Sequence, residues 1–175
     1  ISHQFNEESP YSPYMKYGQS KFLMENYLTS LISKNEFLPI TIIRAPWFYG
    51  PHQPLRQKTF FEMIKAGKFP LIGDGENRRS MVYVKNLAHG IMLASQKKVA
   101  ENEIFWIADK KPYSMNVIIE TVKDVFENEF KIKCKKGNLK APSFIGDIAF
   151  AFDYTLQKIG LYNQKIHVLS EMNKT

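Results

Sequence analysis

The run Ile40-Thr41-Ile42-Ile43 decides the fold, because consecutive β-branched residues are typical of a short, fully buried strand. Residues 16–34, which precede it, carry apolar side chains close to the helical period, and Pro39 separates the two segments. Helical patterns return at residues 58–66, at 86–97, after Ser114 and at 144–159, and strand patterns occur near 71–72, at 80–84 and at 104–108. Strands and helices therefore alternate, which predicts an α/β fold with at least some parallel pairing.

The composition is that of a globular protein, since 44% of the 175 residues are hydrophobic and 23% are charged. No apolar run approaches the roughly 20 residues that a membrane helix needs, so we expect no membrane partner. The first 13 residues are polar and acidic, which argues against a signal peptide, and a single cysteine, Cys134, cannot form an internal disulfide. These features predict a cytoplasmic protein.

The net charge of +7 raises the question of an anionic partner. The densest cluster of positive charge lies at residues 131–136, where lysines alternate with apolar residues, and Lys140 follows. This alternation predicts a half-buried strand whose lysines face water at a sheet edge. No nucleic-acid-binding motif accompanies the lysines, so we expect no nucleic-acid partner. His52, His89 and His167 lack metal-ligand partners at suitable spacing, so no metal site is expected.

The segment Tyr17-Gly18-Gln19-Ser20-Lys21 places a phenol and an ammonium group four residues apart in the predicted helix 16–34. This spacing puts both side chains on one face, one turn apart. A phenol ordinarily ionises near pH ~10, but a neighbouring cation favours the phenolate and makes a tyrosine usable for proton exchange with an alcohol or ketone. The spacing alone is common by chance, so its context decides between a catalytic pair and a surface pair.

Further segments supply that context in a fixed order along the chain. Asn6-Glu7-Glu8-Ser9-Pro10 precedes the Tyr17–Lys21 segment, and Glu25 follows it. Residues 42–51 and 72–84 come next, and residues 104–112 follow them. Together these segments resemble the extended short-chain dehydrogenases/reductases, including the NAD-dependent epimerase/dehydratase group. The resemblance covers roughly residues 5–125.

The resemblance implies the C-terminal part of a Rossmann-type doubly wound sheet and the smaller α/β substrate-binding domain. Residues 1–50 would belong to the dinucleotide-binding domain and carry its active-site helix. Residues 51–175 would belong mostly to the substrate-binding domain, while residues 80–110 return to the Rossmann sheet. No G-x-G-x-x-G turn occurs, so we expect the chain to begin midway through such an enzyme and to be inactive alone. The family's catalytic Ser or Thr would then precede Ile1.

The resemblance also implies the residues of a cofactor site for NAD or NADP. Tyr17 would be the general acid/base, and Lys21 would favour its phenolate and hold the nicotinamide ribose. Ala45, Pro46 and Phe48, just past the strand, would contact the nicotinamide, largely through backbone groups. For Pro46, a purely loop-shaping role is an equal alternative.

Two residues are implied in substrate binding. Arg79 matches a position that contacts the substrate diphosphate in the family's sugar-nucleotide enzymes, with a solvated surface arginine as the alternative. Trp47 stands where several epimerases have an asparagine that faces the substrate. An indole cannot replace the acceptor of an amide, which puts a typical nucleotide-sugar pose in doubt, and core packing explains Trp47 equally well.

The implied function is that of an NAD(P)-dependent epimerase/dehydratase or reductase acting on a sugar nucleotide or a related alcohol or ketone. Hydride transfer would be accompanied by proton exchange at Tyr17. The aromatic run at residues 47–49 keeps open a hydroxysteroid- or dihydroflavonol-type reductase acting on an apolar ketone. A non-catalytic nucleotide-sensing relative is a third alternative. The expected partner is a small-molecule substrate, and a homodimer stays an open option.

Overall fold

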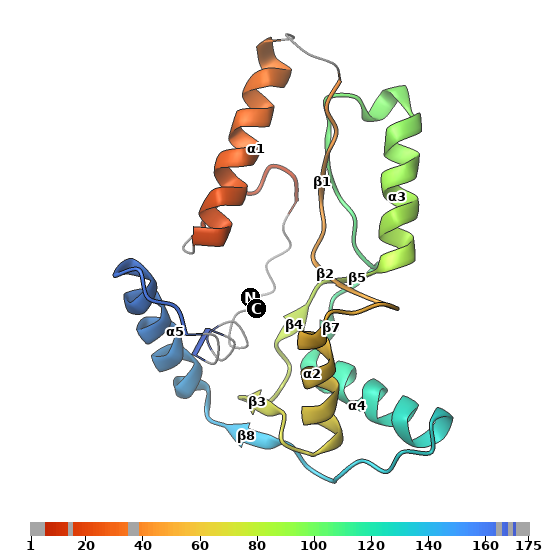
Figure 1. Cartoon of the computed structure of the whole chain (residues 1–175), viewed down its shortest axis with the longest axis vertical. Coiled ribbons are helices and arrows are strands. Elements are labelled where there is room, and N and C mark those ends of the chain that lie inside the picture. The colour runs from red at the N-terminus through yellow and green to blue at the C-terminus, as the bar shows by residue number, and fades with distance from the viewer. Residues whose placement is uncertain (1–5, 14–15, 35–38, 164–165, 168–169, 171–175) are drawn as a thin grey trace. The chain divides into compact units, whose positions relative to one another are not determined.

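The computed structural model describes residues 6–13, 16–34, 39–163, 166–167 and 170 (Figure 1). The chain divides into two compact units. Unit 1 comprises residues 1–50 and 81–110, and unit 2 comprises residues 51–80 and 111–175. Each unit is therefore assembled from segments that are distant in the sequence.

Unit 1 is built on a parallel strand pair with a helix on each side (Figure 1). Strand β1 (Ile42–Arg44) pairs in parallel with β6 (Ile104–Trp106), and their first residues lie opposite one another. Helix α1 (Lys16–Lys34) precedes β1, while α3 (Val84–Gln96) and the single turn η1 (Lys98–Ala100) precede β6. Parallel strands need crossover connections, which place helices on the faces of the sheet. The predicted α/β fold with parallel pairing is confirmed.

A second parallel pair follows the first in unit 1. Strand β2 (Trp47–Tyr49) pairs with β5 (Met81–Tyr83). The prolines and Gly50 within residues 44–54 predict a loop from the sequence. This prediction is wrong for residues 47–49, because the aromatic run forms a ladder with β5. Gly50 ends β2 with a φ of 142°, and an added Cβ would come within 2.5 Å of Val84 Cγ1. The turn after β2 therefore requires glycine.

The core of unit 2 involves helices α2 (Leu55–Lys65) and α4 (Met115–Asp124). Its buried side chains are Ile64, Phe69, Leu71, Met115 and Ile119. Ser114 caps α4 by accepting a hydrogen bond from the backbone N–H of Val117 at 3.3 Å. The two helices thus bury their apolar sides against each other and against Phe69 and Leu71 of the segment that follows α2.

The other elements of unit 2 are short strands and one long helix. Strand β3 (Pro70–Ile72) pairs in parallel with β8 (Leu139–Ala141). Strand β4 (Arg78–Arg79) pairs antiparallel with β7 (Tyr113–Ser114). Helix α5 (Ser143–Lys158) follows β8, close to its predicted bounds. Among the helices that the structure describes, none combines the length and the apolar character that a membrane crossing requires.

The lysine-rich residues 131–136 do not form a strand, contrary to the prediction. They follow a π-helical turn, η2 (Val125–Glu129), and the backbone N–H of Ile132 donates to the carbonyl of Phe126 at 2.8 Å instead of joining a ladder. Cys134 is 6% exposed, whereas the lysines around it are exposed. The alternating pattern therefore does not mark a strand. It arises because Cys134 is buried within an irregular segment whose lysines are exposed.

Candidate active site

Tyr17 and Lys21 lie one turn apart near the start of α1. Lys21 Nζ is 5.6 Å from the centroid of the Tyr17 ring. The two side chains therefore share one face of the helix, as the four-residue spacing predicts. Tyr17 is 70% exposed and Lys21 is exposed as well. Both polar groups are accessible to a ligand, and their role in catalysis stays a prediction.

An ion pair joins α1 to the end of β1. Arg44 is the last residue of β1, and Glu25 follows Lys21 by one turn in α1. Arg44 Nε donates to Oε1 and Oε2 of Glu25 at 3.0 and 3.3 Å, and Nη2 also donates to Oε1. Their side chains are only 10% and 12% exposed. Because a guanidinium contacts a carboxylate through several atoms at once, the pair fixes orientation as well as distance.

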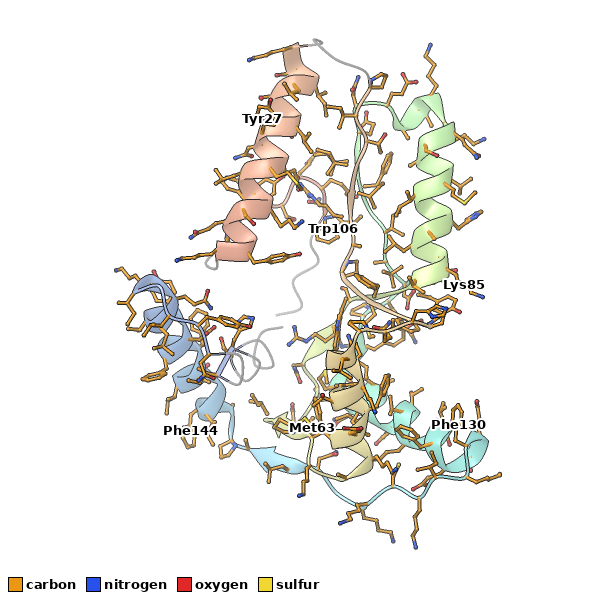
Figure 2. The ribbon with its side chains drawn as sticks, in the orientation of Figure 1. Tyr27, Met63, Lys85, Trp106, Phe130 and Phe144 are labelled. Atoms are coloured by element: carbon orange, nitrogen blue, oxygen red, sulfur yellow. The ribbon has the colours of Figure 1, made fainter. Side chains whose placement is uncertain are left out.

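Tyr11 and Glu7, from the segment before α1, complete this polar cluster. The Tyr11 hydroxyl donates to Glu25 and accepts from Arg44 Nη2. Arg44 Nη1 donates to the carbonyl of Glu7 at 3.0 Å, and the Glu7 carboxylate accepts from the backbone N–H of Trp106 at 2.9 Å. Trp106 is labelled in Figure 2, next to β1. We call these five residues the Arg44 cluster.

The cluster shifts the pKa values of its acidic members. Burial opposes the ionisation of Glu25, but hydrogen bonds from Arg44 and Tyr11 outweigh it, so the pKa of Glu25 is lowered from its ordinary 4.5. Burial and the hydrogen bond to Glu25 raise the pKa of Tyr11 above 10.0. At neutral pH, Glu25 is therefore an ionised acceptor and Tyr11 a neutral donor.

Replacing Glu25 with glutamine is expected to make stability less sensitive to acid. Because folding lowers the pKa of Glu25 below 4.5, its carboxylate stabilises the fold above that pH, and this contribution is lost as the pH falls through the lowered value. The variant should be less stable than the parent at neutral pH, and its free energy of unfolding should change less between about pH 6 and pH 3. Urea unfolding across this range measures both.

Glu8→Gln is the matched control, because Glu8 is an exposed carboxylate in the same segment as Tyr11. It should follow the acid dependence of the parent. A Glu25→Gln variant with that same dependence would contradict the role given to the ion pair.

Residues 45–48 continue directly from Arg44. Ala45 is exposed, Pro46 and Trp47 are half-buried, and Phe48 is 48% exposed. The ladder between β2 and β5 fixes the backbone of Trp47 and Phe48. The segment therefore presents a rigid, partly aromatic surface after the carboxyl end of β1. Its contact with a nicotinamide stays a prediction.

Arg79, the predicted diphosphate contact, lies in unit 2. It is half-buried and stands opposite Tyr113 in the pairing of β4 with β7. Its neighbour Arg78 is exposed. Successive side chains of a strand point to opposite faces, so the two arginines differ in direction. The role of Arg79 toward a substrate stays a prediction. Within the described parts of the chain, no group of three His, Cys, Asp or Glu side chains is placed to hold a metal ion.

The sequence alone did not lead to the Arg44 cluster. Glu25 is the sole acidic residue of α1, and Arg44 directly follows an apolar strand. Glutamate and arginine are rarely buried without a partner. A lone acid within a helix and a base at the end of a buried strand are two signals that could suggest a pair, but neither identifies its partner.

Residues 2–108 match the model of the NAD dependent epimerase/dehydratase family. The uncharacterized protein y4nL of Sinorhizobium fredii is 53% identical over 173 residues, which are 99% of this chain and 49% of the relative. The N-acetyl-alpha-D-glucosaminyl-diphospho-ditrans,octacis-undecaprenol 4-epimerase of Escherichia coli O157:H7 is 30% identical over 121 residues, which are 69% of this chain and 37% of that protein.

A sterol-4-alpha-carboxylate 3-dehydrogenase of Bos taurus is 29% identical over 113 residues, covering 61% of this chain and 32% of that enzyme. The solved dTDP-glucose 4,6-dehydratase of Bacillus anthracis, in complex with NAD, is 25% identical and superposes with a TM-score of 0.61 over 81% of this chain and 44% of its own. This match confirms the predicted Rossmann-type fold. The chain spans about half of the length of y4nL and about a third of the other two relatives.

Proposed function

The chain belongs to the NAD-dependent epimerase/dehydratase family, and from this premise we propose that it carries the proton-exchanging group of an enzyme acting on a nucleotide sugar. The family uses NAD or NADP. The observation that carries the proposal is the pairing of Tyr17 with Lys21 on an exposed face of α1. A phenol and an ammonium in this arrangement suit proton exchange with an alcohol or a ketone.

Tyr17 exchanges a proton with a hydroxyl or carbonyl oxygen of the substrate. When the alcohol is oxidised, the phenolate form of Tyr17 accepts the proton of the hydroxyl. When the ketone is reduced, the phenol donates the proton to the carbonyl oxygen. A bound nicotinamide supplies the hydride acceptor or donor for the same carbon.

The residues of unit 1 fit a nicotinamide cofactor. Lys21 is exposed and carries three N–H donors, which suit the hydroxyl oxygens of a ribose. Ala45, Pro46 and Phe48 follow the carboxyl end of β1, and open α/β sheets bind ligands beyond the carboxyl ends of their strands. We therefore assign cofactor binding to unit 1, and substrate binding mainly to unit 2.

A nucleotide sugar offers a diphosphate and a sugar ring for recognition. The guanidinium of Arg79 suits the diphosphate, because arginine binds phosphate oxygens through two parallel N–H groups. The indole of Trp47 lacks the acceptor of an amide, so Trp47 would contact the sugar through its ring. The name of the Escherichia coli relative specifies a sugar linked through a diphosphate to undecaprenol, which supports a diphosphate-bearing sugar here. The Bacillus anthracis structure is named for a dTDP-sugar, which supports a nucleotide as the other partner of the diphosphate.

A second candidate is the reduction or oxidation of an apolar alcohol or ketone such as a sterol. The relative from Bos taurus is a sterol dehydrogenase, and the aromatic side chains of Phe48 and Tyr49 are 48% and 39% exposed. An apolar substrate has no diphosphate, so its binding would not depend on Arg79. The two candidates therefore differ in whether the KM for the substrate depends on Arg79.

Replacing Arg79 with methionine is expected to raise the KM for a nucleoside-diphosphate sugar about 10- to 150-fold, because a hydrogen bond to a charged group contributes about 1.5–3 kcal/mol. The assay uses the full reading frame that contains residues 1–175, supplied with NAD or NADP and a panel of UDP- and dTDP-sugars. Chromatography separates the epimerised or dehydrated products.

Arg78→Met is the matched control, because it removes the same charge from the opposite face of β4. Its KM should stay close to that of the parent. Equal KM changes for both arginines would overturn the diphosphate contact. Turnover of a sterol ketone without turnover of any nucleotide sugar would favour the second candidate.

A further inference from the structure

We propose that Arg44 is a positioning residue, whose guanidinium holds α1 at the end of β1 so that Tyr17 is oriented for proton exchange. The inference rests on the proposed function and deepens it. It names a side chain that touches neither substrate nor cofactor and yet sets where the proton-exchanging group lies.

The guanidinium of Arg44 makes several hydrogen bonds and lies over two aromatic rings. Its N–H groups donate to Glu25, to the Tyr11 hydroxyl and to the Glu7 carbonyl. Its central carbon lies 5.1 Å from the centroid of the Tyr11 ring and 5.7 Å from that of the Trp106 ring. A planar fork held by several hydrogen bonds and close to two aromatic rings has little rotational freedom. Lysine, a single point charge on a flexible stem, cannot reproduce these contacts.

The contact with Glu25 controls the placement of Tyr17 because both belong to α1. Tyr17, Lys21 and Glu25 follow one another at four-residue intervals, so they occupy successive turns along one side of the helix. Anchoring Glu25 restrains the rotation of α1 about its axis and its position along that axis. Within α1, Glu25 is the sole acidic residue, so this helix has no second carboxylate that can take over the anchor.

Arg44 also lies directly before the segment assigned to the nicotinamide. Arg44 is followed in the chain by residues 45–48, which begin the wall of that proposed site. One residue thus connects the helix that carries the proton-exchanging phenol to the segment that would hold the nicotinamide. Catalytic groups need to be held within about 0.5 Å and 10–20° of the productive geometry. A displacement of about 1 Å costs roughly 100-fold in rate.

Arg44→Lys in the full reading frame is expected to lower kcat roughly 100-fold. The KM for the substrate should stay close to that of the parent, because the partners described for the Arg44 guanidinium are Glu7, Tyr11, Glu25 and Trp106, none of which is assigned to substrate binding. Hydrogen exchange at the backbone amides of α1 should accelerate in the same variant. Arg78→Lys, the same substitution at an exposed arginine, should change neither quantity.

Tyr11→Phe is the second variant, and it keeps the test decisive if Arg44→Lys does not fold. It removes one hydroxyl and leaves the direct pair of Arg44 with Glu25 in place. We expect kcat to fall less, and hydrogen exchange in α1 to accelerate less, than in Arg44→Lys. Tyr27→Phe, an exposed tyrosine of the same helix, should behave as the parent does.

A purely stabilising Arg44 would lower the melting temperature and leave kcat per folded molecule unchanged. That result, or unchanged exchange in α1, would overturn the positioning role while the proposed function stands. Absence of turnover in the parent would overturn the proposed function instead. The exchange measurement would then still judge whether Arg44 anchors α1.

Discussion

Replacing Tyr17 with phenylalanine is expected to lower kcat by about 10²- to 10⁴-fold, the range that general acid–base catalysis contributes. The hydroxyl is the group that exchanges the proton, and phenylalanine keeps the ring that lies beside Lys21. Tyr17 is 70% exposed, so the loss of its hydroxyl should leave the melting temperature unchanged. Initial rates with saturating cofactor and substrate, together with a thermal melt, measure both effects.

Tyr27→Phe provides the control for this loss. Tyr27 lies on the same helix, is 64% exposed and is labelled in Figure 2. Its variant should retain full activity. If Tyr17→Phe retained full activity as well, the acid–base role would be wrong. If the parent bound a dinucleotide without turning over any substrate, and Tyr17→Phe bound it equally well, a nucleotide-sensing relative would be the better description.

The fold was predictable where the structure depends on local patterns. The apolar period of residues 16–34 predicts helix α1 with its observed bounds, and the β-branched run before Arg44 predicts strand β1. Strand β2 was missed because three aromatic residues between Pro46 and Gly50 form no recognisable strand pattern without β5 beside them. The alternation at residues 131–136 was misleading, since a period of two also arises in irregular segments with a few buried side chains.

The candidate site, like the fold, was predictable only where it depends on local spacing. Tyr17 and Lys21 could be paired from the sequence because residues four apart on a helix are neighbours in space. Arg44 and Glu25 lie 19 residues apart, and Arg44 and Tyr11 lie 33 apart. Such contacts depend on how a helix docks on a strand, which no local period encodes. Burial of these two charges was the missing information, and it appears only once the tertiary structure is formed.

Replacing Ile64 with alanine is expected to lower the free energy of unfolding by about 2–5 kcal/mol. Ile64 is 0% exposed and lies in the unit 2 core with Phe69, Leu71, Met115 and Ile119. The rings of Phe60 and Phe69 meet edge to face there, with centroids 5.2 Å apart. Rigid aromatic neighbours move little into the cavity that alanine would leave, so few of the packing contacts of Ile64 should be replaced. Urea unfolding followed by far-UV circular dichroism measures the difference.

Ile148→Ala is the matched control, because the same atoms are removed from a side chain of α5 that is 62% exposed. Its effect should stay within about 0.5 kcal/mol, since alanine also favours the helix. If Ile64→Ala were equally mild, α2 and α4 would not pack around Ile64 as described. The expected difference also separates stability from chemistry, because Ile64 belongs to unit 2 and Tyr17 to unit 1. Ile64→Ala should therefore lower the fraction of folded molecules, whereas Tyr17→Phe should lower the rate of each folded one.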